Sequence, residues 1–178
     1  MRITLAIDTS TSRTSVAVIG DGIILWSGHR DGATEHGPAL PSLVQEGIKG
    51  FVIDEVVVGM GPGPFTGLRV GIAFAQSFAL ARGISVRGVC SLDAIAVQVN
   101  EKDFIVTVDA RRKEVYWARY KDGVRVGEPA VNFPADVAGA PIHSDLYPDM
   151  KALVALAGNI TEPMYLRRPD AVATADRQ

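Results

Sequence analysis

The chain has little of several things that usually mark a function, and each shortage excludes a class of protein. It contains one cysteine, Cys90, so no internal disulfide can form and a reducing compartment such as the cytoplasm is expected. Its 18 basic and 20 acidic residues nearly balance, so no overall positive charge marks a nucleic-acid binder. No signal peptide is recognisable, and no apolar stretch reaches the ~20 residues that cross a bilayer, so no membrane partner is expected.

Catalytic and metal-binding patterns are also missing. The three histidines, His29, His36 and His143, do not form an i, i+4 pair, and neither an H-E-x-x-H motif nor a Cys/His pair occurs. No G-x-S-x-G elbow presents a serine nucleophile. We therefore expect no catalytic residue and no metal site, so the chain is not expected to be an enzyme. Cys90 lies among apolar residues and is expected to be buried and inert.

What the chain does have is a glycine- and proline-rich run from Gly59 to Gly71. It follows an apolar strand at 56–58 and leads into an apolar helix that ends near Arg82. Glycines allow positive φ, prolines fix φ, and Thr66 is expected to cap the helix. Such loops resemble anion cradles, although this one matches neither a Walker A loop nor G-x-G-x-x-G. It predicts either a structural turn or a phosphate or ligand loop formed by Asp8, Thr9, Gly61, Gly63 and Thr66.

The remaining pattern is α/β. Expected strands lie at 3–7, 14–19, 23–27 and 84–89, with a Gly-Asp-Gly hairpin turn at 20–22, and expected helices lie at 36–48, 66–82 and 91–97. A second unit repeats the first, with a strand at 104–108, a hairpin formed by 115–120 and 124–126, and only one later helix at 149–157.

Each unit contains a strand that ends in an aspartate, Asp8 or Asp109, followed by a hairpin. This repeat is typical of the actin/Hsp70/sugar-kinase (ASKHA) architecture, which has two lobes with mixed sheets. We expect a first lobe at 1–99, a reduced second lobe at 104–170 and a flexible tail at 171–178.

Both aspartates have a plain structural interpretation. The hydroxyl residues after Asp8 include no glycine that would bring a backbone amide close to a phosphate, so Asp8 can instead form a local Asx turn. Asp109 precedes a basic cluster that is either a solvated loop or a tRNA contact made by Arg111, Arg112 and Lys113.

The long helix is apolar almost all round, and small residues recur at every fourth position from Gly67. Either it is buried with the preceding helix inside the chain, or both helices present a surface to a partner. The predicted partner interface consists of Leu40, Leu43, Val44, Gly67, Leu68, Gly71, Ile72, Ala75 and Ala79.

Four segments resemble the TsaB (YeaZ) family: GPGPFTGLRVG at 61–71, Ala6 to Thr11, Val108 to Tyr116, and Pro163 to Arg167. The resemblance implies a non-catalytic subunit of the complex that installs threonylcarbamoyl on the adenosine beside the anticodon of tRNA. It also implies a TsaD-like catalytic partner, a TsaE-like ATPase, a homodimer when alone and indirect contact with tRNA.

ATP and a metal would then be used by the partner subunits, and no cofactor is assigned to this chain. The chain is short in its C-terminal half for this family. The alternative interpretation is a small ATPase or phosphotransferase of the same architecture.

Overall fold

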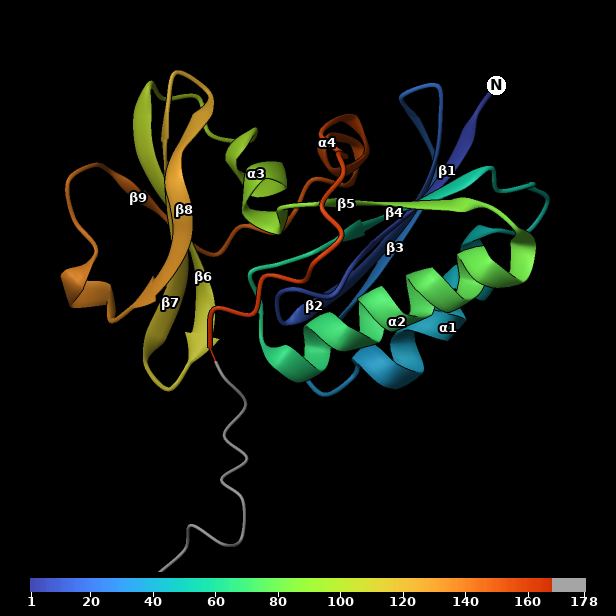
Figure 1. Cartoon of the computed structure of the whole chain (residues 1–178), viewed down its shortest axis with the longest axis horizontal. Coiled ribbons are helices and arrows are strands. Elements are labelled where there is room, and N and C mark those ends of the chain that lie inside the picture. The colour runs from blue at the N-terminus through green and yellow to red at the C-terminus, as the bar shows by residue number, and fades with distance from the viewer. Residues whose placement is uncertain (168–178) are drawn as a thin grey trace, which may run out of the picture.

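The computed structural model describes residues 1–167 and shows two β-sheets side by side, each accompanied by helices (Figure 1). The predicted tail at 171–178 lies outside the described residues. No helix within residues 1–167 is both long enough and apolar enough to cross a membrane.

The first sheet is mixed. It contains β1 (Ile3–Asp8), β2 (Arg13–Gly20), β3 (Ile23–Asp31), β4 (Glu55–Gly59) and β5 (Ser85–Val89), in the order β3-β2-β1-β4-β5. The first three strands are antiparallel, and Asp21 and Gly22 connect β2 to β3 with φ of 47° and 78°. Strands β4 and β5 run parallel to β1, which requires a helical crossover before each.

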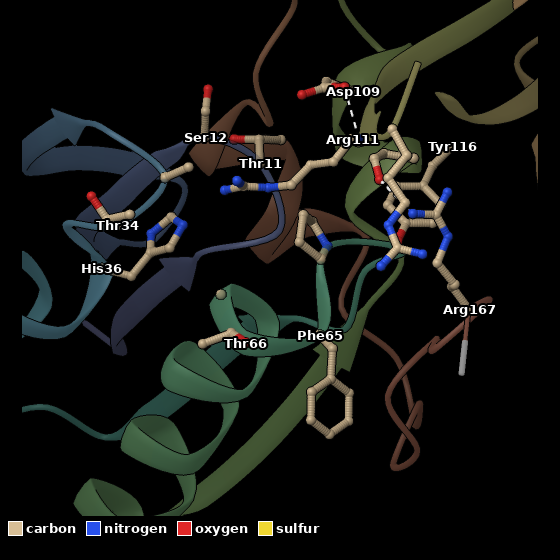
Figure 2. A pocket seen from close by; sticks show the side chains of 15 residues that line it. Thr11, Ser12, Thr34, His36, Phe65, Thr66, Asp109, Arg111, Tyr116 and Arg167 are labelled. Atoms are coloured by element: carbon tan, nitrogen blue, oxygen red, sulfur yellow. Dashed lines mark hydrogen bonds between the residues drawn. The ribbon is translucent and has the colours of Figure 1, made fainter. Parts of the chain in front are cut away.

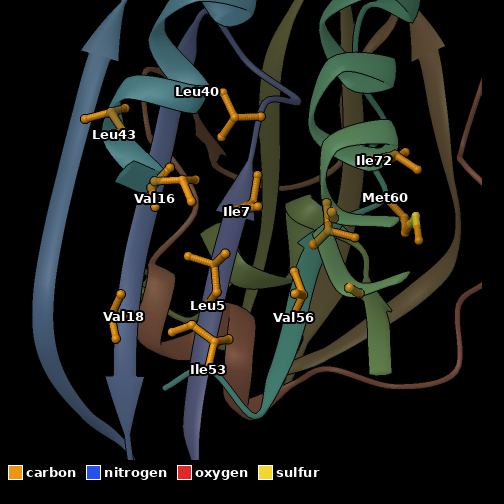
Figure 3. Packing of buried hydrophobic residues seen from close by; sticks show 14 of the residues in the cluster. Leu5, Ile7, Val16, Val18, Leu40, Leu43, Ile53, Val56, Met60 and Ile72 are labelled. Carbon is orange, nitrogen blue, oxygen red and sulfur yellow. The ribbon is translucent and has the colours of Figure 1, made fainter. Parts of the chain in front are cut away.

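Those crossovers are α1 (His36–Gly47) and α2 (Phe65–Arg82), which lie together on one face of the first sheet (Figure 1). Their apolar sides meet the inward side chains of the strands, with Leu40 and Ile72 above Ile7 and Val56 (Figure 3). The helix α2 ends where Gly83 adopts a left-handed φ of 63°.

The second sheet contains β6 (Asp103–Arg111), β7 (Glu114–Lys121), β8 (Val124–Asn132) and the two-residue β9 (Ile142–His143), in the order β8-β7-β6-β9. Strand β9 runs parallel to β6, and the hairpin strands are antiparallel. A short 3₁₀ turn, η1 (Pro134–Asp136), follows β8. The helix α3 (Ser91–Ala96) packs against β6 and β7.

The chain then returns to the first sheet. The helix α4 (Met150–Ala155) contacts β1, β2 and β4, and its Leu153 is buried with Ala6, Ala17 and Val57. The fold is therefore α/β with two lobes and mixed sheets, as the repeated strand, aspartate and hairpin predict. The domain boundaries remain a prediction, and α4 shows that a late segment contributes to the core of the first sheet.

One local expectation about the Gly/Pro loop is wrong, and only one of its two glycines at 61 and 63 uses the positive φ that glycine allows. Thr66 does not cap α2, because the helix begins one residue earlier and its N-cap position is Pro64, which makes no side-chain cap. Gly63 does not adopt positive φ, whereas Gly61 does, at 89°. The space around Gly63 explains the glycine instead, since a Cβ there would lie 2.5 Å from the carbonyl oxygen of Ser10.

Candidate functional site

A cavity of about 860 Å³ lies between the two lobes. Its walls come from the turn after β1, the start of α1, the start of α2 and the turn between β6 and β7 (Figure 2). The polar and aromatic lining residues include Thr11, Ser12, Thr34, His36, Phe65, Thr66, Asp109, Arg111, Arg112, Tyr116 and Arg167. Of the predicted ligand-loop and tRNA-contact residues, this cavity therefore brings together Thr66, Arg111 and Arg112.

His36 forms the first-lobe wall at the N-terminal end of α1 (Figure 2). It is buried, and its Nδ1 lies 2.8 Å from Oγ1 of Thr14, so the two atoms share a hydrogen bond. Burial lowers the pKa of His36 below 6.5, and the positive charge of Arg111 across the cavity acts in the same direction, although Asp8 opposes it. A neutral imidazole therefore lines this wall at neutral pH.

Asp8 does not line the cavity, because its carboxylate is fully buried and already bonded. Its Oδ1 accepts hydrogen bonds from the amide (2.9 Å) and the hydroxyl (2.7 Å) of Ser10, and its Oδ2 accepts one from the hydroxyl of Ser91 (2.6 Å). Burial raises the pKa of Asp8, and these hydrogen bonds act against that rise. The Asx-turn interpretation is confirmed, so Asp8 ties β1 to α3.

The hydroxyl of Thr9 is likewise engaged in hydrogen bonds within the chain. Its hydroxyl donates to the carbonyl of Gly67 at 2.7 Å and accepts from the amide of Gly71 at 3.1 Å. A Cβ on Gly71 would lie 2.4 Å from Oγ1 of Thr9. Gly67 and Gly71 therefore leave room for the turn after β1, not for a helix of another protein.

The predicted partner interface needs correction for the same reason. All nine of its residues are buried inside the first lobe: Leu40, Leu43, Val44, Gly67, Leu68, Gly71, Ile72, Ala75 and Ala79. An apolar helix must be covered on several sides, and here the sheet, α1 and the turn after β1 supply the cover. The interpretation that the two helices are buried inside the chain is the one that the structure supports.

The Gly61 to Thr66 loop is held mainly by contacts within the chain. The carbonyl of Gly61 accepts a hydrogen bond from the amide of Ser91 at 2.8 Å, and its amide donates to the Ser91 hydroxyl at 3.3 Å. Neither Gly61 nor Gly63 lines the cavity, whereas Phe65 and Thr66, in the first turn of α2, do. The loop thus fixes the position at which α2 begins.

The second-lobe wall is basic. Arg111, Arg112 and Lys113 all adopt left-handed φ, at 62°, 55° and 66°, and the Arg111 amide donates to Oδ1 of Asp109 at 2.9 Å. Arg111 and Arg112 line the cavity, whereas Lys113 does not. Residues other than glycine rarely adopt this backbone conformation, and here three in a row form the turn between β6 and β7. The turn directs the Arg111 side chain toward the first lobe (Figure 2).

Most cavity residues were not among the sites predicted from the sequence, and Phe65, Tyr116 and Arg167 are three of them. Arg167 forms an ion pair with Glu114 and donates to the carbonyl of Ala110 at 3.2 Å, so it braces the basic turn from behind. All three residues belong to segments that resemble the TsaB family. That resemblance is the sequence feature from which they could have been predicted as site residues.

Neither metal ligands nor a reactive thiol are assembled at this site. The part of the chain that the structure describes holds no cluster of three or more His, Cys, Asp or Glu side chains placed to bind a metal ion. Cys90 is buried outside the cavity, and burial raises its pKa to about 12, so its thiol stays protonated at neutral pH.

Comparison with known proteins agrees with this geometry. The model of the family described as "TsaD: tRNA N6-adenosine threonylcarbamoyltransferase" matches residues 14–171. The uncharacterized protein Rv3421c of Mycobacterium tuberculosis is 42% identical over 94% of this chain and 92% of its own length. The tRNA threonylcarbamoyladenosine biosynthesis protein TsaB of Escherichia coli is 37% identical over 72% of this chain.

Some relatives are longer than this chain. The matched regions span 60% of the E. coli protein and 58% of the uncharacterized protein ML0378 of Mycobacterium leprae. Among solved structures, YeaZ from Pseudomonas aeruginosa superposes with a TM-score of 0.74 at 27% identity, covering 88% of this chain and 90% of that one. The chain therefore belongs to the TsaB (YeaZ) family.

Proposed function

We propose that the chain is a non-catalytic partner subunit in the synthesis of threonylcarbamoyladenosine in tRNA. The observation that supports a non-catalytic role most directly is the state of Asp8, whose two carboxylate oxygens accept three hydrogen bonds from Ser10 and Ser91. An aspartate that faces a metal and phosphates would need those oxygens free. The name of the E. coli relative supports the pathway.

In this proposal a TsaD-like subunit performs the transfer, and this chain binds it. Because the apolar stripe of α2 is internal, the partner surface must lie on the outer sides of α1 and α2, which run side by side (Figure 1). Most exposed residues of these two helices are small or uncharged, and Leu80 is 84% exposed: Pro38, Pro41, Ser42, Gln45, Ala73, Gln76, Ser77 and Leu80. The exposed charged residues of the two helices are Glu46, Arg69 and Arg82, which lie outside this stretch.

Two aromatic side chains add apolar area to this surface. Phe74 and Phe78 are half-buried on α2, and their rings stack with centroids 6.0 Å apart. No charged residue occurs between 38 and 45 or between 73 and 80. The core of a protein–protein interface typically has few charged residues and is enriched in aromatic residues, as this surface is. We also propose that the chain forms a homodimer through the same surface when it is alone. A TsaE-like ATPase is the proposed third subunit, and the proposed location is the cytoplasm.

The experiment is co-purification with the TsaD-like protein of the same organism, followed by a threonylcarbamoyl-transfer assay with and without this chain. Ala73→Arg, at the centre of the proposed surface, should abolish both association and the stimulation of transfer. Ala155→Arg is the matched control, because Ala155 is an exposed alanine on α4. Unchanged association of the folded Ala73→Arg variant would refute this surface, and transfer at full rate without the chain would refute the proposed role.

The cavity between the lobes supports a second candidate, a small ATPase or phosphotransferase. Its about 860 Å³ would hold a nucleotide-sized ligand, and Arg111 and Arg112 line it. ATP hydrolysis by the purified chain that is lost in the Arg111→Ala variant would favour this candidate. ATP hydrolysis at background level, together with partner-dependent stimulation of transfer, would favour the subunit.

A further inference from the structure

A pair of aromatic rings lies at the start of α2, where Phe65 lines the cavity. The rings of Phe65 and Tyr165 have centroids 4.8 Å apart and planes inclined by 50°. The guanidinium carbon of Arg69 lies 5.1 Å from the centroid of the Phe65 ring. Tyr165 is 37% exposed, and Arg69, one helical turn after Phe65, is exposed as well. The group therefore offers an aromatic surface next to a cation.

The segment that carries Tyr165 is held in place by main-chain bonds. The amide of Met164 donates to the carbonyl of Met60 at 2.8 Å, and the amide of Tyr165 donates to the carbonyl of Pro163 at 3.0 Å. Two residues further on, Arg167 is bonded to Glu114 and to the carbonyl of Ala110. These contacts fix the Tyr165 ring between the loop before α2 and the basic turn of the second lobe.

Three separate segments that resemble the TsaB family thus meet at one place. The Gly/Pro loop supplies Phe65, the turn after β6 supplies Arg111, and the segment 163–167 supplies Arg167, all three of which line the cavity (Figure 2). The same last segment supplies Tyr165, whose ring contacts Phe65. The partner surface proposed above uses none of them. The fold therefore gathers aromatic and cationic groups at the mouth of the cavity, whereas the chain as a whole is slightly acidic.

We propose that this group, the Tyr165 platform (Phe65, Arg69, Arg111 and Tyr165), binds single-stranded RNA directly. An unpaired base would stack on the exposed Tyr165 ring, which Phe65 supports, while the guanidinium groups of Arg69 and Arg111 contact backbone phosphates. Aromatic rings interleaved with arginines are how proteins hold unpaired RNA. The inference rests on the proposed role in tRNA modification. It extends the possible tRNA contact at Arg111 to an aromatic ring, in place of the indirect contact that the family resemblance implies.

Single-stranded RNA fits better than duplex RNA or a protein segment. A stacking ring can reach a base only when that base is unpaired, and the platform offers one exposed ring, not a groove that would cover a helix. Of the carboxylates on these segments, Glu114 is paired with Arg167, whereas Asp109 and Glu162 are exposed, and Asp109 accepts a hydrogen bond from the Arg111 amide. The guanidinium groups of Arg69 and Arg111 supply the positive charge that contact with a phosphate backbone requires.

The test measures the affinity of the full chain for a short fluorescent single-stranded RNA and for a duplex of the same sequence, by anisotropy at several salt concentrations. Tyr165→Ala should weaken single-strand binding about tenfold or more, because stacking on an aromatic side chain is lost. Tyr165→Phe should keep the affinity, since it preserves the ring. Phe133→Ala is the matched control, because Phe133 is an exposed aromatic residue after β8.

The contribution of Arg69 and Arg111 is measured separately, by the salt dependence of RNA affinity. Removing Arg69 and Arg111 together should make the logarithm of affinity depend less steeply on the logarithm of salt concentration, by about 0.7 for each phosphate that the protein no longer neutralises. Lys49→Ala removes an exposed charge in the loop after α1 and should leave the slope unchanged. Equal binding of single strand and duplex, or an unchanged slope in the double variant, would contradict the proposed geometry.

Failure of this inference can be told apart from failure of the proposed function. If wild-type protein binds no RNA, or Tyr165→Ala binds it as wild type does, the platform is refuted, whereas association with the TsaD-like partner still decides the subunit role. If Tyr165→Ala keeps RNA affinity but loses the partner, the platform is a protein contact and the inference is wrong. A defect confined to RNA binding and to tRNA modification, with partner association intact, is the expected result.

Discussion

Gly59 and Asp8 lie so close on the neighbouring strands β4 and β1 that a Cβ on Gly59 would be 1.9 Å from Oδ2 of Asp8. The same Cβ would lie 2.5 Å from the hydroxyl oxygen of Ser91, which is the hydrogen-bond donor to that carboxylate. The absence of a side chain at residue 59 is therefore what allows Asp8, Ser10 and Ser91 to form a closed hydrogen-bond network at the ends of β1 and β4.

This relationship predicts the effect of Gly59→Ala. The added methyl group must displace either the carboxylate or the Ser91 hydroxyl, and overpacking of a filled core costs about 1–3 kcal/mol. We expect the free energy of unfolding in urea to fall by about that amount. Gly37→Ala is the control, because Gly37 is in α1 with nothing near its Cβ position, so this change should be neutral or stabilising. Equal stability of both variants would show that the network is loosely packed.

A second prediction concerns Gly63, whose φ is ordinary. A Cβ there would lie 2.5 Å from the Ser10 carbonyl oxygen and 2.8 Å from the Ser10 Cα, and backbone atoms cannot move aside as a side chain would. Gly63→Ala should therefore lower the free energy of unfolding by about 1–3 kcal/mol, and Gly63→Val should lower it further. Thermal melting with Gly158→Ala as the control measures this, since the Cβ position of Gly158 is open. A variant that melts like wild type would mean that the loop shifts freely away from the turn after β1.

A third prediction concerns the buried carboxylate of Glu55. Burial raises its pKa, but hydrogen bonds from Arg87 and Thr4 and the charges of Arg87 and Arg2 outweigh burial and hold the pKa below 4.5. A lowered pKa means that the stabilisation is fully present above the unfolded-state value and is lost as pH falls through the folded-state value. Arg87→Ala should cost about 1–3 kcal/mol at pH 7, and the difference from wild type should narrow below about pH 4.5.

The control for this measurement is Asp31→Ala, which removes an exposed ion pair with Arg13. Surface pairs contribute about 0–1 kcal/mol, so this variant should remain near wild type at pH 7. Arg87 also donates to the carbonyl of Ala157 at 2.9 Å, just after α4, so its loss should loosen that segment as well. A cost that stays constant down to pH 3 would show that the effect comes from this second contact alone.

A fourth prediction concerns His36. Because burial lowers its pKa below 6.5, the unfolded chain takes up a proton first as the pH falls. The free energy of unfolding should therefore decrease as pH drops below about 6.5, until the folded-state pKa is reached. His36→Gln, which does not titrate, should show a flatter profile between pH 7 and 5.5. Parallel profiles of wild type and His36→Gln would show that the imidazole is not the titrating group.

The sequence alone determined most of the elements and their order, although it did not predict η1 or β9. The two strand-aspartate-hairpin units, the glycine turns at 20–22 and 121–123 and the helical spacing in α1 and α2 all correspond to elements in the structure. These signals are local, because turn residues and apolar periodicity act over a few neighbouring residues. Resemblance to the TsaB family was likewise readable from four short segments.

Only the tertiary structure decided which groups are free to act. The sequence left Asp8 and Thr9 open as ligand residues or as parts of a structural turn, and the structure shows that Ser91 and Gly71, far along the chain, form hydrogen bonds with their polar atoms. The apolar stripe of α2 read as a partner surface, but the turn after β1 covers it. Tyr165 meets Phe65 across a hundred residues of chain. The local sequence pattern shows which face of a helix or strand is apolar. Only the packing of segments that are distant in sequence decides what covers that face.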